Sequence, residues 1–248
     1  MALAPGTARA IGRSLRIYHG DPERNRAMDA LYRRFVGPGG LAFDIGAHVG
    51  DRISSFRRLG ARVVALEPQP GPARALRLIH GRDPHVALLG AAVGDAGGEV
   101  RLHLNTANPT VSTLSESFVQ AAAGADGWEG QVWDRVIVVP CLTLDDLIAC
   151  HGRPDFIKID VEGFEDRVLR GLNVPVVALS FEFTTIARDV SERCLDRLSA
   201  LGDYRYNLAL GETQELVLET FVDAAAMRQY LRELPHAANS GDVYAVLK

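Results

Sequence analysis

The chain has 248 residues, 47% hydrophobic and 23% charged, which suits one α/β domain with additional segments. Its formal net charge of −4 at pH 7 argues against a nucleic-acid partner, because such proteins usually carry a basic face. The 3 cysteines show no disulfide or zinc spacing, and no apolar run reaches the ~18 residues of a membrane span. These features predict a cytoplasmic protein with no membrane partner.

The first 40 residues are expected to form a helical lead-in. Apolar residues recur at helical spacing from Met28 to Phe35, and the glycine-rich segment 37–40 ends the pattern. Arginines at 24, 26, 33 and 34 alternate with acidic residues, which is typical of a solvated helix face.

From Leu41 onward, short apolar runs alternate with amphipathic stretches. Strands are predicted at Leu41–Ile45, Val63–Leu66 and Val86–Ala92. A helix that carries Ile53, Phe56 and Leu59 and stops at Gly60 lies between the first two, and another is predicted at Pro72–His80. This β–α–β–α–β order makes a parallel sheet with right-handed crossovers.

The second half continues the alternation. Further strands are expected at Glu99–Leu104, Val136–Val139, Phe156–Asp160, Val176–Phe183, Tyr204–Leu210, Glu215–Leu218 and Val243–Leu247. Further helices are expected after Thr143 and at Phe164–Arg170, Val190–Leu201 and Asp223–Leu234, the first of them with capping-box spacing between Thr143 and Asp146.

Residues 105–135 show no periodicity and are expected to be a loop insertion that serves as a lid or substrate loop. Its aromatic residues, Phe118, Trp128 and Trp133, either wall an acceptor pocket or anchor the loop by packing. No internal repeat or second hydrophobic core is evident, so residues 41–248 are expected to form one domain.

A glycine turn follows the first strand. Gly46 and Gly50 let the backbone pass close to a ligand, and Ala47 and His48 lie between them. Asp44 stands where a dinucleotide site has its first glycine. A carboxylate repels a pyrophosphate but attracts the amino group of a methionine moiety, so the turn favours S-adenosylmethionine.

Glu67 ends the second strand, 23 residues after Asp44. In nucleotide-binding α/β folds a carboxylate about 20 residues after the glycine turn accepts hydrogen bonds from ribose hydroxyls. Pro68 restricts Glu67 to an extended conformation, which fixes the direction of its side chain.

The segment Asp155–Glu165 carries a second group of carboxylates. Asp160 falls at the carboxyl end of its strand, on the same rim as Asp44 and Glu67, and Glu162 follows in a turn that Gly163 allows. Asp160 and Glu162 are therefore expected to converge near the reacting groups.

From about Phe43 to Lys248 the chain resembles the FkbM family of methyltransferases. The segments that carry the resemblance are Phe43-Asp-Ile-Gly-Ala-His-Val-Gly50, Leu66-Glu-Pro68, Ala91-Ala-Val-Gly-Asp95, Thr143-Leu-Asp-Asp146 and Ile157-Lys-Ile-Asp-Val-Glu-Gly163. The resemblance implies a doubly wound, mostly parallel, seven-stranded Rossmann-like α/β sheet and O-methylation of a hydroxyl on a sugar, polyketide or other secondary metabolite. His48 departs from the family's pattern, in which Asn is commoner.

The resemblance also implies roles for individual residues. It places Ala92 and Val93 beside the adenine and Asp160 and Glu162 at the reaction centre, and Glu182 matches a family carboxylate at the end of the next strand. The predicted cofactor-binding residues are Asp44, Gly46, Ala47, His48, Gly50, Glu67, Pro68, Ala92, Val93 and Asp160.

Methyl transfer to a hydroxyl needs positioning and a group that takes the proton. The candidate catalytic residues are Asp160, Glu162, Glu182 and His48, with Asp160 or Glu162 favoured as general base. Neighbouring carboxylates repel one another, which raises at least one pKa. A magnesium ion on these oxygens is an alternative that is not favoured.

Three other functions stay open. A nicotinamide-dependent oxidoreductase would need a third glycine at the start of the helix, where Asp51-Arg52-Ile53 offers none. A cofactor-binding module without turnover is disfavoured because Asp160, Glu162 and Glu182 are all present. A nucleic-acid methyltransferase is disfavoured by the acidic balance and by the absence of an Asn-Pro-Pro-Tyr type motif.

Overall fold

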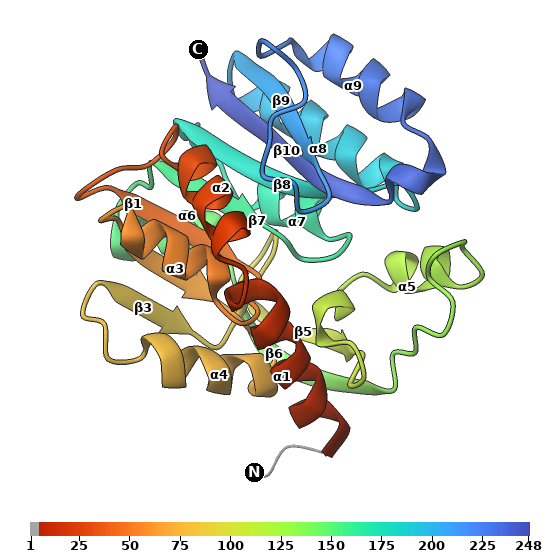
Figure 1. Ribbon diagram of the computed structural model, residues 1–248. Coiled ribbons are helices and arrows are strands. Elements are labelled where there is room, and N and C mark those ends of the chain that lie inside the picture. The colour runs from red at the N-terminus through yellow and green to blue at the C-terminus, as the bar shows by residue number, and fades with distance from the viewer. Residues whose placement is uncertain (1–4) are drawn as a thin grey trace.

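One large sheet with helices on both faces organises the computed structural model, which describes residues 5–248 (Figure 1). Residues 1–4 of the expected lead-in lie outside the described residues. The helices are α1 Pro5–His19, α2 Pro22–Tyr32, α3 Asp51–Arg58, α4 Pro70–His80, α5 Glu116–Ala122, α6 Leu144–His151, α7 Glu165–Arg170, α8 Arg188–Leu201 and α9 Ala224–Glu233, with 3-10 turns η1 Pro109–Val111 and η2 His236–Ala238. The strands are β1 Leu41–Ile45, β2 Arg62–Leu66, β3 Val86–Leu89, β4 Ala92–Val93, β5 Gly98–Leu104, β6 Arg135–Leu142, β7 Phe156–Ile159, β8 Ala178–Thr184, β9 Tyr204–Leu210 and β10 Ser240–Leu247.

The main sheet has seven strands in the order β3-β2-β1-β7-β8-β10-β9. All neighbours pair in parallel except β10, which is antiparallel to both β8 and β9. The chain order reverses between β1 and β7, and in such sheets ligands bind beyond the carboxyl ends of the strands at this switch point. The expected seven-stranded, mostly parallel α/β fold is confirmed.

Two apolar cores, one on each face, hold this sheet between its helices. Alternate residues of a strand point to opposite faces, so in β1 Phe43 enters the core under α6 to α9, while Ala42 enters the core under α2, α3 and α4. Helix α2 begins at the cap of Asp21 and packs Met28 and Tyr32 against α3. Helix α2 of the lead-in thus belongs to the layer of helices that packs on one face of the main sheet.

A smaller three-stranded sheet, β4-β6-β5, lies beside the main one. The predicted strand Val86–Ala92 is wrong as a single element: β3 stays in the main sheet, the chain breaks at Gly90, and Ala92 pairs with Cys141 in the small sheet. The run is apolar throughout, so its side-chain pattern could not show this change of sheet.

The predicted strand Glu215–Leu218 is also wrong. This segment is held by the side chain of Asn207 and does not form a regular strand ladder. The Asn207 amide donates to the carbonyl of Leu218 at 2.7 Å and accepts from the N–H of Leu218 at 3.0 Å. Within residues 5–248, no helix is long and apolar enough to cross a membrane.

Residues 105–135 contain a helix that the sequence pattern did not predict. Ser115 caps α5 by accepting from the N–H of Phe118, and the ring of Phe118 packs edge-on against Trp128 with 5.2 Å between centroids. Phe118 and Trp128 are buried in the main core, and Trp133 packs against it. Of the two interpretations of these aromatic residues, the packing anchor is the one that the structure supports.

Candidate active site

The turn after β1 is shaped by backbone conformations that glycine favours. Gly46 has a φ of 87°, and its N–H and that of Ala47 donate to the carbonyl of Leu66 at 3.0 and 2.9 Å. A Cβ at Gly46 would lie 1.8 Å from the backbone oxygen of Asp160. The turn is therefore pressed against the ends of β2 and β7, which brings the three strand ends to one place.

A cavity with about 980 Å³ of empty volume, counted to its open mouth, lies at these strand ends. The predicted site residues that line it are Asp44, Gly46, Ala47, His48, Glu67, Pro68, Ala92, Val93, Asp160, Glu162 and Glu182. Gly50 does not line it: a Cβ there would meet Leu76 and His80, so this glycine serves helix packing behind the turn.

Asp44 is a buried carboxylate with an unsatisfied oxygen. Its side chain is 2% exposed, and Oδ2 has no hydrogen-bond partner among the described residues. Burial raises its pKa to about 7. An ammonium group in the cavity would supply the missing donor and restore the charged form.

Glu67 is held by backbone donors on both of its oxygens. The N–H of His48 donates to one at 2.9 Å and that of Gln69 to the other at 2.7 Å. Burial nevertheless raises the pKa of Glu67 to about 8. Because each carboxylate oxygen has a second lone pair, the side chain can still accept from a pair of hydroxyls.

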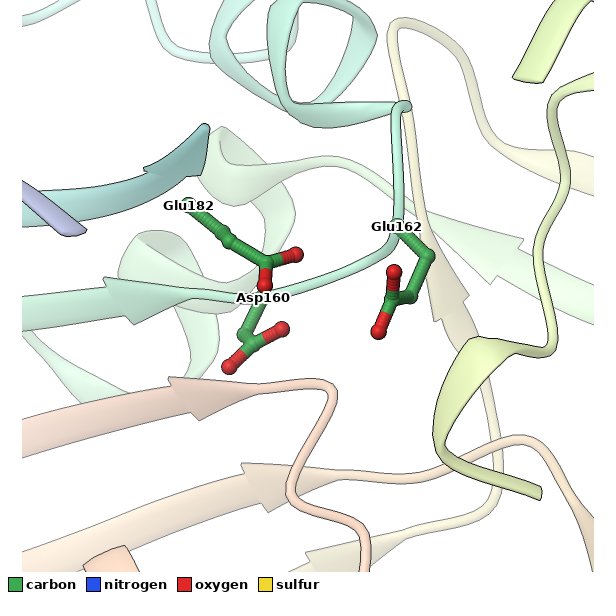
Figure 2. A group of neighbouring side chains, drawn as sticks. All are labelled: Asp160, Glu162 and Glu182. Atoms are coloured by element: carbon green, nitrogen blue, oxygen red, sulfur yellow. The ribbon is translucent and has the colours of Figure 1, made fainter. Parts of the chain in front are cut away.

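Three carboxylates that line the cavity lie close together (Figure 2). One oxygen each of Asp160, Glu162 and Glu182 lies within 4.8 Å of the others. Asp160 follows β7, Glu182 lies on β8, and Glu162 sits in a turn with a φ of 58°. A residue from another segment holds this turn in place: the hydroxyl of Thr113 donates to the carbonyl of Glu162 at 2.6 Å.

The three carboxylates differ in their charge environment because of Lys158. This ammonium is 1% exposed and donates to Asp160 at 3.0 Å and to Asp242 at 2.7 Å. Although burial alone would raise it, the attraction of Lys158 holds the pKa of Asp160 below its ordinary value. Burial and the charge of Asp160 raise the pKa of Glu162 and of Glu182 well above the usual carboxyl range.

Sequence reasoning missed Lys158, which it counted only as part of a strand. The signal was available, since this lysine is the one charged side chain in the otherwise apolar run Phe156-Ile-Lys-Ile159. A charged residue inside a buried strand needs a partner, and the nearest acidic residue along the same strand face is Asp160.

His48 lies in the turn with both ring nitrogens unpartnered among the described residues, and the ring of Tyr18 meets it edge-on at 5.9 Å. Burial lowers the pKa of His48 to about 4, so the ring is neutral at ordinary pH. A neutral ring can accept a proton, but its low pKa makes it a weaker base than Glu162 or Glu182.

An ion-pair network, buried except for the exposed Glu212, walls the cavity on the side of the lead-in. Arg24 bonds Asp51 at 2.9 Å and Glu212 at 2.6 Å, and Arg52 bonds the same two carboxylates. Arg24 was expected on a solvated face, and that expectation is wrong because two acidic partners from distant parts of the chain enclose it. Tyr18, Asp51, Arg52 and Glu212 all line the cavity.

The comparisons with known proteins agree with this geometry. The model of the methyltransferase FkbM domain matches residues 44–235. The chain belongs to this family. It is an S-adenosylmethionine-dependent methyltransferase, and the expectation of S-adenosylmethionine as cofactor is confirmed. The alternative of a nicotinamide-dependent oxidoreductase is thereby set aside.

The chain is also similar, at low identity, to solved structures of methyltransferases. One is an O-methyltransferase from Bacillus cereus in complex with SAH, at 11% identity and a TM-score of 0.46, with 97% of this chain and 91% of that chain covered. Another is precorrin-6y C5,15-methyltransferase from Geobacter metallireducens GS-15, at 16% identity and a TM-score of 0.42, with 87% and 85% covered. No curated protein sequence matches the chain significantly.

The methyltransferase fits its cofactor better than it fits a metal ion. The unsatisfied oxygen of Asp44 suits the ammonium of a methionine moiety, and the free lone pairs of Glu67 suit a ribose. Asp160, Glu162 and Glu182 are spaced to bind a divalent cation, but the ammonium of Lys158 already lies 3.0 Å from Asp160. This fixed positive charge disfavours a divalent ion that would need all three carboxylates as ligands.

Proposed function

We propose that the protein transfers the methyl group of S-adenosylmethionine to a hydroxyl of a small molecule, such as a sugar or another secondary metabolite. The observation that supports this most directly is the pair Glu162 and Glu182, two cavity carboxyls whose pKa is raised. A hydroxyl acceptor loses its proton on methylation, and a carboxylate with a raised pKa is a stronger base for it.

Residues of the first three strand ends would hold the cofactor. Asp44 accepts from the amino group, Glu67 from the ribose hydroxyls, and Ala92 and Val93 form part of an apolar wall for the adenine. When bound, the cofactor supplies an activated methyl group on a positively charged sulfur. The chain positions the acceptor in line with it and excludes water from the cavity.

Proton transfer falls to Glu162 or Glu182 in this proposal, in preference to Asp160. Lys158 keeps Asp160 ionised, which makes it a weak base but a suitable negative charge beside a cationic donor. The glutamate carboxylate would accept the proton that the acceptor hydroxyl loses when its oxygen takes the methyl group, and the methyl donor would be left without its positive charge.

The test is a screen of hydroxylated acceptors with the purified protein, with product masses read by spectrometry. We expect O-methylated product, a large loss of turnover in Glu162→Gln or Glu182→Gln, and unchanged turnover in the exposed control Glu219→Gln. Methyl transfer to RNA or to a nitrogen or carbon acceptor, with no O-methylation across the panel, would contradict the proposal. The cytoplasmic location also stays a prediction, as does the division of the chain into a lead-in of residues 1–40 and a domain of residues 41–248.

A further inference from the structure

Helices α1 and α4 carry a basic surface, although the whole chain has a net charge of −4. Neither helix contains an Asp or a Glu. Their exposed arginines, with one more just after α4, are Arg9, Arg13, Arg16, Arg74, Arg77 and Arg82. The two helices contact each other and lie together at the lower edge of the molecule in Figure 1.

These six arginines share a lack of acidic partners. Among the described residues none of the six forms an ion pair, whereas Arg57, Arg167, Arg193, Arg228 and Arg232, for example, all do. Arg13 donates to the carbonyl of Ala107, a contact that leaves its charge uncompensated. On α1 the arginines are three and four residues apart, so they share one face of the helix.

Large aliphatic side chains are exposed among these charges. Ile17 on α1 is 54% exposed, and on α4 Leu78 is 79% and Ile79 46% exposed. The inner faces of the same helices are closed by Ile11 and Ala75, which pack together. The exposed aliphatic groups are therefore additional to those that the fold uses to join the two helices.

We propose that this α1–α4 face docks on the surface of an anionic bilayer. Arginines attract anionic headgroups, and aliphatic side chains enter the boundary between headgroups and acyl chains. A nucleic-acid duplex would use the arginines but not Leu78 or Ile79. The sequence predicted no membrane partner because it has no apolar run long enough to span a bilayer. Docking on a bilayer surface needs no such run, so that argument does not exclude it.

The face borders the cavity. Tyr18 near the end of α1 and Gln69 at the start of α4 both line it, and Arg13 ties α1 to the segment before η1, whose Thr110 also lines it. A bilayer held against this face would lie beside the cavity, in reach of an acceptor that partitions into membranes.

The experiment is flotation of the full chain with vesicles of phosphatidylcholine, or of phosphatidylcholine and phosphatidylglycerol in equal amounts. We expect binding to the anionic vesicles only. The triple variant Arg74→Gln, Arg77→Gln, Arg82→Gln should bind on the order of 100-fold more weakly, at about fivefold for each arginine. The control Arg62→Gln, Arg101→Gln, Arg135→Gln removes the same charge from exposed positions elsewhere and should bind as the unmodified chain does.

A second variant, Leu78→Ser with Ile79→Ser, leaves the charge unchanged and should weaken vesicle binding by about tenfold or more. Unchanged S-adenosylhomocysteine binding in every variant shows that the fold is intact. The proposal is overturned by absence of binding to anionic vesicles, by equal loss in the control triple, or by no loss in the aliphatic variant. Tighter binding to a DNA duplex than to vesicles would assign the face to nucleic acid instead.

Discussion

Glu67→Gln offers a quantitative test of the cofactor site, because the ionisation of Glu67 should be coupled to binding. Burial raises the pKa of this carboxyl to about 8, so in the free protein at pH 7 it is mostly protonated. Ribose hydroxyls that donate to it favour the carboxylate. Each pH unit below the pKa then costs about 1.4 kcal/mol of binding free energy, or tenfold in affinity.

The variant should therefore differ from the unmodified chain in the pH dependence of its affinity as well as in the affinity itself. Glutamine keeps the size of the side chain but cannot ionise, so it lacks the part of the pH dependence that Glu67 contributes. The ratio of the two dissociation constants should grow on the order of 100-fold between pH 6 and pH 9, and level off above pH 8. Asp44, with its pKa of about 7, should make a separate contribution to the pH dependence of binding, and Asp44→Asn should remove that contribution.

Calorimetric titration with S-adenosylhomocysteine at four pH values measures this ratio directly. Glu219→Gln, an exposed change of the same kind, serves as the control and should follow the unmodified chain at every pH. Parallel pH profiles for Glu67→Gln and the unmodified chain would refute the reasoning, since Glu67 would then not change its charge on binding.

Four further outcomes follow from the same geometry. Burial raises the pKa of Asp44 to about 7 and of Glu67 to about 8, so the folded protein binds these two protons more tightly than the unfolded chain does. The resulting stability is complete below pH ~4 and is lost as the pH rises through 7 and 8. Scanning calorimetry of the free protein should therefore show a melting temperature that falls from pH 5 to pH 8 rather than rises. Whichever of Glu162 and Glu182 is the general base, its change to Gln should lower turnover about 100-fold or more while S-adenosylhomocysteine affinity stays within a few-fold, and a matching loss of affinity would argue for a binding role. Gly46→Ala should destabilise the fold by about 2 kcal/mol or more in urea unfolding, because its Cβ would lie 1.8 Å from a backbone oxygen, and an unchanged midpoint would contradict this. Dialysis against a chelator should leave turnover unchanged, and activity that returns only with magnesium would show that the acidic cluster holds a metal.

The sequence was sufficient for the parts of the fold that repeat a simple pattern. Short apolar runs that end in glycine or a carboxylate predicted β1, β2 and β7, and parallel pairing then requires their ends to meet. The observed register, with Asp44 beside Ala65 and Lys158, brings Asp44, Glu67 and Asp160 to one rim as expected.

The remainder depended on contacts between distant segments. Tyr18 and Glu212 reach the cavity from the lead-in and from the loop between β9 and α9, and no local spacing relates either residue to the turn after β1. The same holds for Arg24, whose partners Asp51 and Glu212 are 27 and 188 residues away. Such pairs are set by how the elements pack, which a single sequence does not encode as a periodic signal.

The cavity as a whole is arranged to receive a cation. Lys158 is committed to Asp160 and Asp242, so the remaining buried carboxyls must relieve their repulsion by taking up protons. A ligand with an ammonium and a sulfonium replaces those protons and makes the ionised forms favourable again. Cofactor binding would in this way release the proton from Glu162 or Glu182, and the general base would become available only once the methyl donor is in place.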